Sequence, residues 1–208
     1  MTAVASGSST FVDASGLPLA DTYRFLSGAI VPRPIAWVTS GVAPKPLNLA
    51  PFSAFAWVSQ HPPMIGITVN LRDGLVKDTV RNMREDGEFV VHIAHEGQLE
   101  VLHASSEARE PGESEVELLG LRVADSVKVS VPRLADARIA MECRYDRTIQ
   151  FSPTGGDFIV GTVVGWHIDD EIREGGRIIT ERLRPLARVG GPHYGILGEI
   201  VPKPAYPG

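Results

Sequence analysis

The triplet Lys77-Asp78-Thr79 places a cation, a carboxylate and a hydroxyl at the start of a segment with helical character. The N-terminus of a helix exposes unpaired backbone N–H groups and partial positive charge, so it is suited to holding a phosphate. Lys77 would add charge to such a site and Thr79 a hydroxyl donor, whereas Asp78 is expected to cap the helix. The alternative is an ordinary capped surface helix, which the triplet taken alone favours because such caps are common.

The run Asn48-Leu49-Ala50-Pro51-Phe52-Ser53 lies between two segments with strand character. Pro51 stiffens this connection, and a stiff loop presents its backbone N–H groups in fixed directions. Such a loop suits a planar heterocycle rich in hydrogen-bond acceptors, with Asn48 and Ser53 adding side-chain contacts. An ordinary turn that buries Phe52 in the core explains the run equally well.

Two further stretches carry groups that could contact a ligand. Arg33 stands between two prolines, which limits the backbone freedom lost on fixing it, and its guanidinium could meet a phosphate or carboxylate bidentately. A surface arginine in a salt bridge is the simpler alternative. His193 and Tyr194 lie beside glycines in the run LARVGGPHYG, which indicates an exposed loop where functional groups concentrate. A histidine in such a loop is still more often solvated than bound to a ligand.

The sequence lacks the motifs of several enzyme classes. No G-x-G-x-x-G follows a strand, and neither G-x-x-x-x-G-K-[ST] nor G-x-S-x-G occurs. The six histidines show no H-E-x-x-H or other tight ligand spacing, so hydrolase and metalloenzyme interpretations are weak. Cys143 is the single cysteine, which excludes an internal disulfide, and its place in an apolar pattern predicts a packed thiol.

The composition fits one domain with a real core, since 43% of the 208 residues are hydrophobic and 22% are charged. The net charge of −5 gives no reason to expect nucleic-acid or anionic-membrane binding. No apolar run is long enough to span a bilayer, and the N-terminus lacks the basic start and apolar core of a secretory signal. We expect a flexible leader over residues 1–18, a single domain over 19–208 and a cytoplasmic location.

The local patterns predict many short strands and few helices. Two helices are expected, one capped by Asp21 and one stopped by Gly87, together with a charged helical excursion over 97–120. The turn residues 153–156 predict that the last two strands pair as a hairpin. This content points to an antiparallel barrel or sandwich. The expected helices are 21–27 and 77–86, and the expected strands are 34–40, 54–59, 64–69, 88–94, 139–145 and 158–168.

The last two expected strands show period-two patterns. In the first, one set of side chains is assigned to the buried face and the alternate set, Ala140, Glu142 and Arg144, to the opposite face. In the second, a similar set is assigned to one face. The first set is Ile139, Met141, Cys143 and Tyr145, and the second is Phe158, Val160, Val164, Trp166 and Ile168.

Taken together and in this order, these features resemble the flavin reductase-like family, whose members have the FMN-binding split-barrel fold. The resemblance rests on the stretches YRFLSGAIVPRPIAWVTS, NLAPFSAFAWVSQHPPMIGITV, KDTVRNMREDGEFVVHI and PLARVGGPHYG. It covers nearly the whole chain from about Tyr23 to Tyr194. The region 97–138 is the least family-like, and substrate-side differences are expected there.

The resemblance implies a mainly β fold, a Greek-key split β-barrel with a few flanking helices, and a homodimer with FMN near the interface. The flavin ring would lie against the NLAPFS run, with Thr39 and Ser40 lining the same pocket. Lys77, Asp78 and Thr79 would help to hold the ribityl phosphate tail. The remaining residues that the resemblance assigns to the flavin site are Asn82, Arg188 and Tyr194, joined by Arg33 from the pattern above.

The leading functional hypothesis is an oxidoreductase in which NADH or NADPH passes a hydride to bound flavin, and His193 is the candidate for contacting the nicotinamide. Reduced FMN would then serve a partner monooxygenase or act within the protein. A second hypothesis is an FMN-binding electron carrier, similar to flavoredoxin, that a partner reduces. A split barrel for haem or another planar ligand, and a pyridoxal-phosphate type oxidase, fit the motifs less well.

Overall fold

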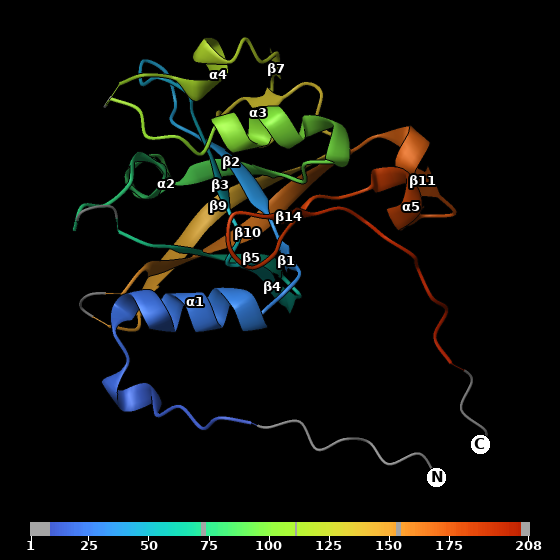
Figure 1. The fold of residues 1–208 in the computed structure, drawn as a ribbon. Helices are drawn as coiled ribbons and strands as arrows, with labels where there is room; N and C mark the ends of the chain where they lie inside the picture. Colours follow the sequence, from blue (N-terminus) through green and yellow to red (C-terminus); the bar gives the residue numbers. More distant parts are fainter. Residues whose placement is uncertain (1–8, 72–73, 111, 153–154, 205–208) are drawn as a thin grey trace.

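The computed structural model describes residues 9–71, 74–110, 112–152 and 155–204, and its main element is a seven-stranded sheet (Figure 1). All neighbouring strands in it are antiparallel, in the order β3-β2-β6-β9-β10-β5-β4. The strands are β2 (Ala36–Ser40), β3 (Asn48–Phe52), β4 (Phe55–Gln60), β5 (Pro63–Val69), β6 (Glu88–His92), β9 (Ile139–Gln150) and β10 (Asp157–Ile168).

The sheet curls until its two ends approach each other, because β3 at one edge contacts β5 near the other. This curl makes a split barrel, whose interior holds the main hydrophobic core. The core side chains come from alternate positions of the strands and from one face of α2 (Asp78–Asp86). They include Val38, Ile67, Met83, Phe89, Cys143 and Ile159, all at most 1% exposed. The predicted packed thiol of Cys143 is therefore confirmed, and burial raises its pKa.

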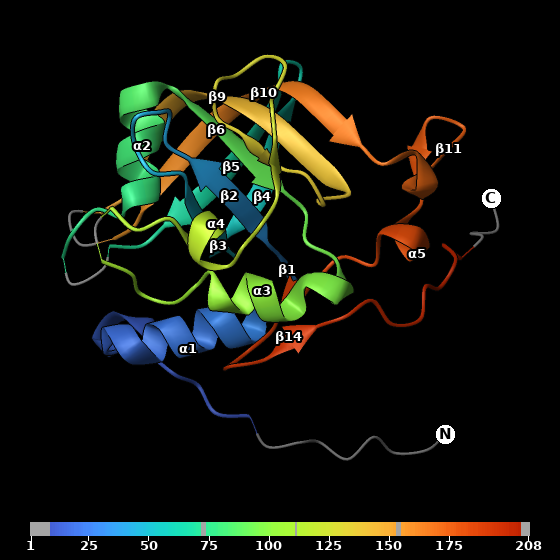
Figure 2. The same cartoon turned by 90° about the horizontal axis from the view of Figure 1, so that it is seen from above.

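Helix α2 covers one flank of the barrel, against β2, β3 and β6 (Figure 2). It ends as the sequence predicts, because Gly87 takes the left-handed conformation, with φ of 71°, and its N–H bonds the carbonyl of Met83. Its start differs from the prediction, since the N-cap residue is Lys77 and Asp78 already lies in the first turn. The Asp78 carboxylate instead pairs with Arg81, at 2.6 Å.

The N-terminal helix α1 (Leu19–Ala29) is longer than the predicted 21–27, and its N-cap is Pro18 rather than Asp21. Proline is favoured at helix starts because its fixed φ suits the helix and it lacks an N–H that would be unsatisfied there. A short 3-10 turn, η1 (Ala14–Gly16), precedes it. Residues 1–8 of the expected leader lie outside the described residues.

The NLAPFS run forms strand β3 and not the predicted loop. It pairs with β2, so that Ser40 faces Asn48 and Trp37 faces Pro51. A proline lacks the N–H that a central strand needs, but β3 lies at the edge of the sheet, where this loss is tolerated. Proline therefore marks an edge strand here.

The β9–β10 hairpin is confirmed, although both strands are longer than predicted and Pro153 and Thr154 of its turn lie outside the described residues. Two register shifts, between Val160 and Gly161 and between Val163 and Gly165, change which side chains face inward. The predicted face of the second strand holds only in part. Ile168 packs against the main core, but that core also receives Ile159 and Val163 from the other set, and Trp166 is 51% exposed.

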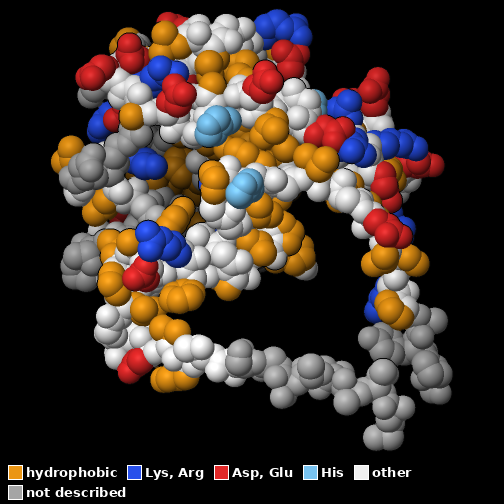
Figure 3. Space-filling model, in the orientation of Figure 1, with side chains coloured by type: hydrophobic (Ala, Val, Ile, Leu, Met, Phe, Trp, Pro, Cys, Tyr) orange, Lys and Arg blue, Asp and Glu red, His pale blue; other side chains and the backbone are white. Residues whose placement is uncertain are grey.

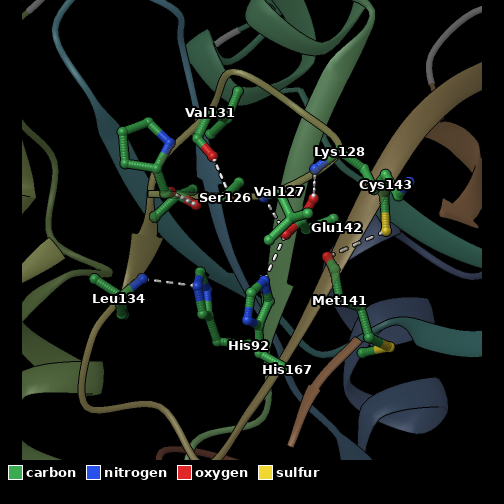
Figure 4. Close-up of polar contacts among 12 residues, drawn as sticks. His92, Ser126, Val127, Lys128, Val131, Leu134, Met141, Glu142, Cys143 and His167 are labelled. Carbon is green, nitrogen blue, oxygen red and sulfur yellow. Dashed lines mark hydrogen bonds and ion pairs between the residues drawn. The ribbon is translucent and has the colours of Figure 1, made fainter. Parts of the chain in front are cut away.

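The face prediction for β9 is also wrong at Glu142. This residue was assigned to the face opposite the buried one, yet it is fully buried. The segment 125–134 folds over that face and supplies hydrogen bonds to the carboxylate (Figure 4). The predicted helical excursion is confirmed as 3-10 helix η2 (Glu96–Gln98), α3 (Leu99–Ala104) and α4 (Glu115–Leu118), but its apolar side chains, Leu102 and Val116, enter a second core beneath β2 and β3.

The remaining elements are short. The strand predicted over 34–40 is divided into β1 (Arg33–Pro34) and β2. The run 186–195, where an exposed loop was predicted, forms two strands, of which the first pairs with β1 and the second with the first. The C-terminal segment then leaves the barrel in an extended path (Figure 1). These elements are β13 (Ala187–Arg188), β14 (Tyr194–Gly195), β7 (Val123–Ala124), β8 (Arg133–Leu134), η3 (Asp170–Ile172), β11 (Arg173–Glu174), β12 (Arg177–Ile178) and α5 (Thr180–Leu183).

Candidate flavin site

A cavity of about 340 Å³ lies along the outer edge of β3, where the start of α2 and the segment from α3 to α4 meet it. Strand β3 contributes backbone and side chains from its exposed edge, and α2 contributes its first turn. Residues of the segments 105–110 and 113–115 form the opposite wall. The lining residues are Asn48, Ala50, Pro51, Leu75, Val76, Lys77, Asp78, Thr79, Ser105, Ser106, Glu107, Arg109, Glu110, Glu113 and Glu115.

The first turn of α2 gives this cavity an anion-binding end. The Lys77 side chain makes no capping hydrogen bond to the first turn, in which the Val80 N–H bonds the Lys77 carbonyl at 3.0 Å. Asn48 Nδ2 donates to Thr79 Oγ1 at 2.9 Å, which leaves the hydroxyl proton of Thr79 able to reach another acceptor. Lys77 Nζ lies 5.5 Å from the centre of the Phe52 ring, beside β3.

The opposite wall contributes a second cation, Arg109. Its guanidinium contacts the Glu107 carboxylate at 3.1 Å, but its Nε is buried and has no hydrogen-bond partner among the described residues. A buried donor without an acceptor is costly, so this N–H is suited to an acceptor supplied by a ligand.

Glu115 faces the same cavity from the start of α4. Its carboxylate accepts the backbone N–H of Leu49, on β3, at 2.9 Å. Burial raises the pKa of this carboxyl, and the hydrogen bond from Leu49 lowers it less. Glu115 therefore satisfies a backbone donor that the edge of β3 would otherwise expose.

A second cavity, of about 350 Å³, adjoins the first, since Pro51 and Ser106 line both. Tyr194 Oη lies 3.2 Å from Nδ1 of His103, on α3, and the Arg188 guanidinium lies 4.7 Å from the centre of the Tyr194 ring. The face in Figure 3 shows a hollow with hydrophobic side chains in it and histidine side chains at its margin. The lining residues are Ile35, Pro51, Ser53, His103, Ser106, Arg188, Pro192 and Tyr194.

The structure thus brings most of the predicted site residues together around two adjoining cavities. Those that line one or both are Asn48, Ala50, Pro51, Ser53, Lys77, Asp78, Thr79, Arg188 and Tyr194. The other predicted residues lie near the cavities but do not line them. They are Arg33, Thr39, Ser40, Leu49, Phe52, Asn82 and His193.

Several of these non-lining residues make contacts within the fold. Arg33 donates to the carbonyls of Ser27 and Ile30, at 2.5 and 2.8 Å, and so fastens the end of α1 to the barrel. Thr39 is fully buried and donates to the Pro132 carbonyl at 2.8 Å. Leu49, Phe52, Ser40 and Asn82 are also buried.

The histidine beside the second cavity is His103 and not His193. His193 is exposed, and its Nδ1 lies 3.3 Å from the Gly190 carbonyl in the turn between β13 and β14. His103, Arg109 and Glu115 were absent from the sequence prediction. The one signal that could have found them is their position within 97–138, the region expected to carry substrate-side differences.

A separate polar cluster, shown in Figure 4, serves the fold. The carboxylate of Glu142 accepts the N–H groups of Val127 and Lys128, at 2.8 and 2.5 Å, and contacts Nε2 of His167 at 2.5 Å. Burial alone would raise the pKa of Glu142, but these hydrogen bonds lower it overall. His92 bonds the Trp37 carbonyl through Nδ1 and the Leu134 N–H through Nε2, and burial lowers its pKa to about 4.

The described residues hold no cluster of three or more histidine, cysteine, aspartate or glutamate side chains arranged to bind a metal ion. Among the same residues, no helix has the length and apolar character needed to cross a membrane.

The curled antiparallel sheet defines a split-barrel protein with two adjoining cavities beside β3. Comparison with known proteins assigns the family: residues 27–187 match the flavin reductase like domain, and the chain belongs to this family. It is 41% identical over 192 residues to the uncharacterized protein YwrF of Bacillus subtilis, with 89% of this chain and 94% of that protein covered.

Solved structures agree with this assignment. Component B of nitrilotriacetate monooxygenase from Bacillus cereus is 37% identical, with a TM-score of 0.90 and coverage of 95% of this chain and 100% of that one. The 2-nitrobenzoate 2-nitroreductase NbaA of Pseudomonas fluorescens is 31% identical, with a TM-score of 0.86 and coverage of 95% and 96%. The flavoredoxin of Desulfovibrio vulgaris (Miyazaki F), 19% identical with a TM-score of 0.73 and coverage of 84% and 91%, shares the fold alone.

Proposed function

We propose that this protein is an FMN-binding oxidoreductase that accepts a hydride from NADH or NADPH. The observation that carries the proposal is the meeting, in one cavity, of the exposed edge of β3 with the first turn of α2. A strand edge suits the polar rim of a flat ring, and a helix N-terminus suits a phosphate. The flavin reductase like family supplies the ligand class.

The side chains around the first cavity fit FMN. Lys77 and Thr79 at one wall and Arg109 at the other would hold the phosphate, and the buried Nε of Arg109 would gain the acceptor that it lacks. Asn48, Ala50 and Pro51 would lie beside the ring. Five carboxylates line the same cavity and would repel a phosphate. Lys77, Thr79 and Arg109 are therefore needed to offset this repulsion.

The bound flavin would supply the redox chemistry, taking a hydride from the nicotinamide and passing electrons on. The chain's own residues would place the ring and control its surroundings. Glu115 fixes the Leu49 N–H and keeps the strand edge in one position. Arg188, whose guanidinium also bonds the carbonyls of His193 and Gly191, would keep the second cavity open for the reaction partner of the flavin.

Several exposed apolar surfaces support the expected homodimer. Helix α1 has no buried residue, although it carries Tyr23, Phe25 and Leu26, which are 58%, 54% and 56% exposed. On the edge strand β4, Trp57 is 76% exposed. An apolar helix and an apolar strand edge on one subunit suit contact with a second copy.

The monooxygenase component from Bacillus cereus supports a partner monooxygenase as one acceptor of the electrons. An electron carrier that lacks nicotinamide activity is the alternative, and one experiment separates the two. The visible spectrum of the purified protein is recorded with FMN bound, before and after NADH or NADPH is added without oxygen. Bleaching at a rate above that of free FMN supports the proposal and identifies the donor.

Two outcomes would count against the proposal. A bound flavin that neither nucleotide bleaches, but that dithionite reduces, would favour the carrier. A protein that stays colourless in the presence of FMN would overturn flavin binding itself. Size-exclusion chromatography with light scattering tests the dimer, and a monomer would remove that part of the proposal.

A further inference from the structure

The two adjoining cavities differ in charge, although Pro51 and Ser106 line both. The first contains five carboxylates, on Asp78 and on four glutamates of the segment 105–115. The second has no carboxylate among its described lining residues, although the chain has a net charge of −5. Its charged side chain is the guanidinium of Arg188. An anion in the second cavity therefore meets no repulsion from a described lining carboxylate.

The polar groups of the second cavity are mainly hydrogen-bond donors. Arg188 has five N–H hydrogens, and two of its nitrogens bond the carbonyls of Gly191 and His193. Tyr194 and His103 share a hydrogen bond of 3.2 Å. If Tyr194 donates, Nε2 of His103 carries a proton, and if His103 donates, the hydroxyl proton of Tyr194 is available. Either arrangement leaves this pair a proton to donate.

The walls of the second cavity suit a flat, apolar body. Ile35, Pro51 and Pro192 line it together with the Tyr194 ring, whose edge meets the His103 ring at an interplanar angle of 82°. The volume of about 350 Å³ is at the lower end for small-molecule sites. It accommodates a single substituted ring.

We propose that the second cavity binds a small aromatic carboxylate, with His103 and Tyr194 as the residues that determine its specificity. The carboxylate would lie against Arg188 and the His103–Tyr194 pair, and the ring against the prolines. The position of this ligand next to a flavin rests on the proposed function. Its binding to the second cavity is independent of that function. A neutral carboxamide would bind less tightly to the same residues, because its hydrogen bonds with Arg188 lack the charge of a carboxylate acceptor.

Benzoate and benzamide test this proposal, because they have the same shape and differ in charge. Their dissociation constants for the purified protein are measured by ligand-observed NMR, with and without FMN. We expect benzoate to bind about tenfold more tightly than benzamide, since its hydrogen bonds are charge-assisted. With FMN bound, benzoate should also shift the visible flavin spectrum.

Three variants locate the ligand. Y194F removes the hydroxyl but keeps the ring beneath Arg188, and H103L removes the imidazole. Each should weaken benzoate binding by about fivefold or more and change the affinity for benzamide little. H193L is the matched control, because His193 is exposed and outside the cavity, and it should bind benzoate as the wild type does. Unchanged melting temperatures show that the variants fold.

Benzamide binding as tight as benzoate, or benzoate binding that neither Y194F nor H103L weakens, would overturn the proposal. So would the absence of benzoate binding at millimolar concentrations. These failures are distinct from failure of the proposed function, which is judged by FMN binding to the wild type. A protein that binds benzoate but not FMN would keep the carboxylate site and lose the flavin.

Discussion

Replacing Lys77 by glutamine should weaken the binding of FMN and leave the binding of riboflavin almost unchanged, because only FMN carries the phosphate that Lys77 would contact. The substitution removes the charge but keeps most of the length of the side chain. It should leave α2 intact, since Lys77 makes no side-chain capping hydrogen bond there. The two ligands share the ring and the ribityl chain, so their difference isolates the phosphate.

The size of the effect follows from the position of Lys77. A hydrogen bond to a charged group contributes about 1.5–3 kcal/mol, which is about 10- to 150-fold in affinity. Lys77 is only half-buried, so solvent screens its charge and the lower end applies. We therefore expect about a tenfold loss for FMN, and a change of at most about twofold for riboflavin.

Quenching of flavin fluorescence gives both dissociation constants in one assay. The matched control is K45Q, because Lys45 pairs with Glu85 and Asp86 near the other end of α2 and does not line the cavity. It removes the same charge from the protein and should change neither affinity by more than about twofold. Equal losses for FMN and riboflavin in K77Q, or a loss in K45Q as large as that in K77Q, would refute a specific phosphate contact.

Three further outcomes are expected. Burial lowers the pKa of His92 from 6.5 to about 4, so the free energy of unfolding should fall as the pH drops through this range, by about 3 kcal/mol at most. Urea titrations should show a smaller fall in H92Q, and an equal fall would contradict this. G161A should cost about 1–3 kcal/mol, because its new Cβ would lie 2.4 Å from the buried Phe89 ring, whereas G28A, with open space around it, should be neutral or stabilising. R109Q should weaken FMN binding about as much as K77Q does. If R109Q binds both FMN and riboflavin as tightly as the wild type does, Arg109 serves the fold alone.

Local sequence patterns were sufficient for several of the regular elements. The strand predicted over 64–69 forms most of β5, and the hairpin of β9 and β10 followed from the turn residues between them. Gly87 ended α2 as predicted, because glycine takes the left-handed conformation at little cost. The ordered motifs also indicated the flavin reductase-like family, to which the chain belongs.

Other features depended on contacts between distant segments. The NLAPFS run is a strand because its register with β2 satisfies the backbone and its position at the sheet edge tolerates Pro51. Glu142 is buried because the segment 125–134 covers it and donates to its carboxylate. Alternation along one strand cannot reveal such a cover, and a local pattern around a proline cannot reveal a place at the sheet edge.

The sequence by itself determined most of the longer strands, the helices α1 and α2, the family and the chemical groups near β3 and α2, because these depend on neighbours within a few residues. Only the tertiary structure decided which groups share a cavity. His103 and Tyr194 are 91 positions apart, and they meet because α3 packs beside the β13–β14 hairpin. His193 is next to Tyr194 in the chain, yet it points away into its own turn. His193 belongs to the turn and Tyr194 to β14, so adjacency in sequence did not predict adjacency at the site.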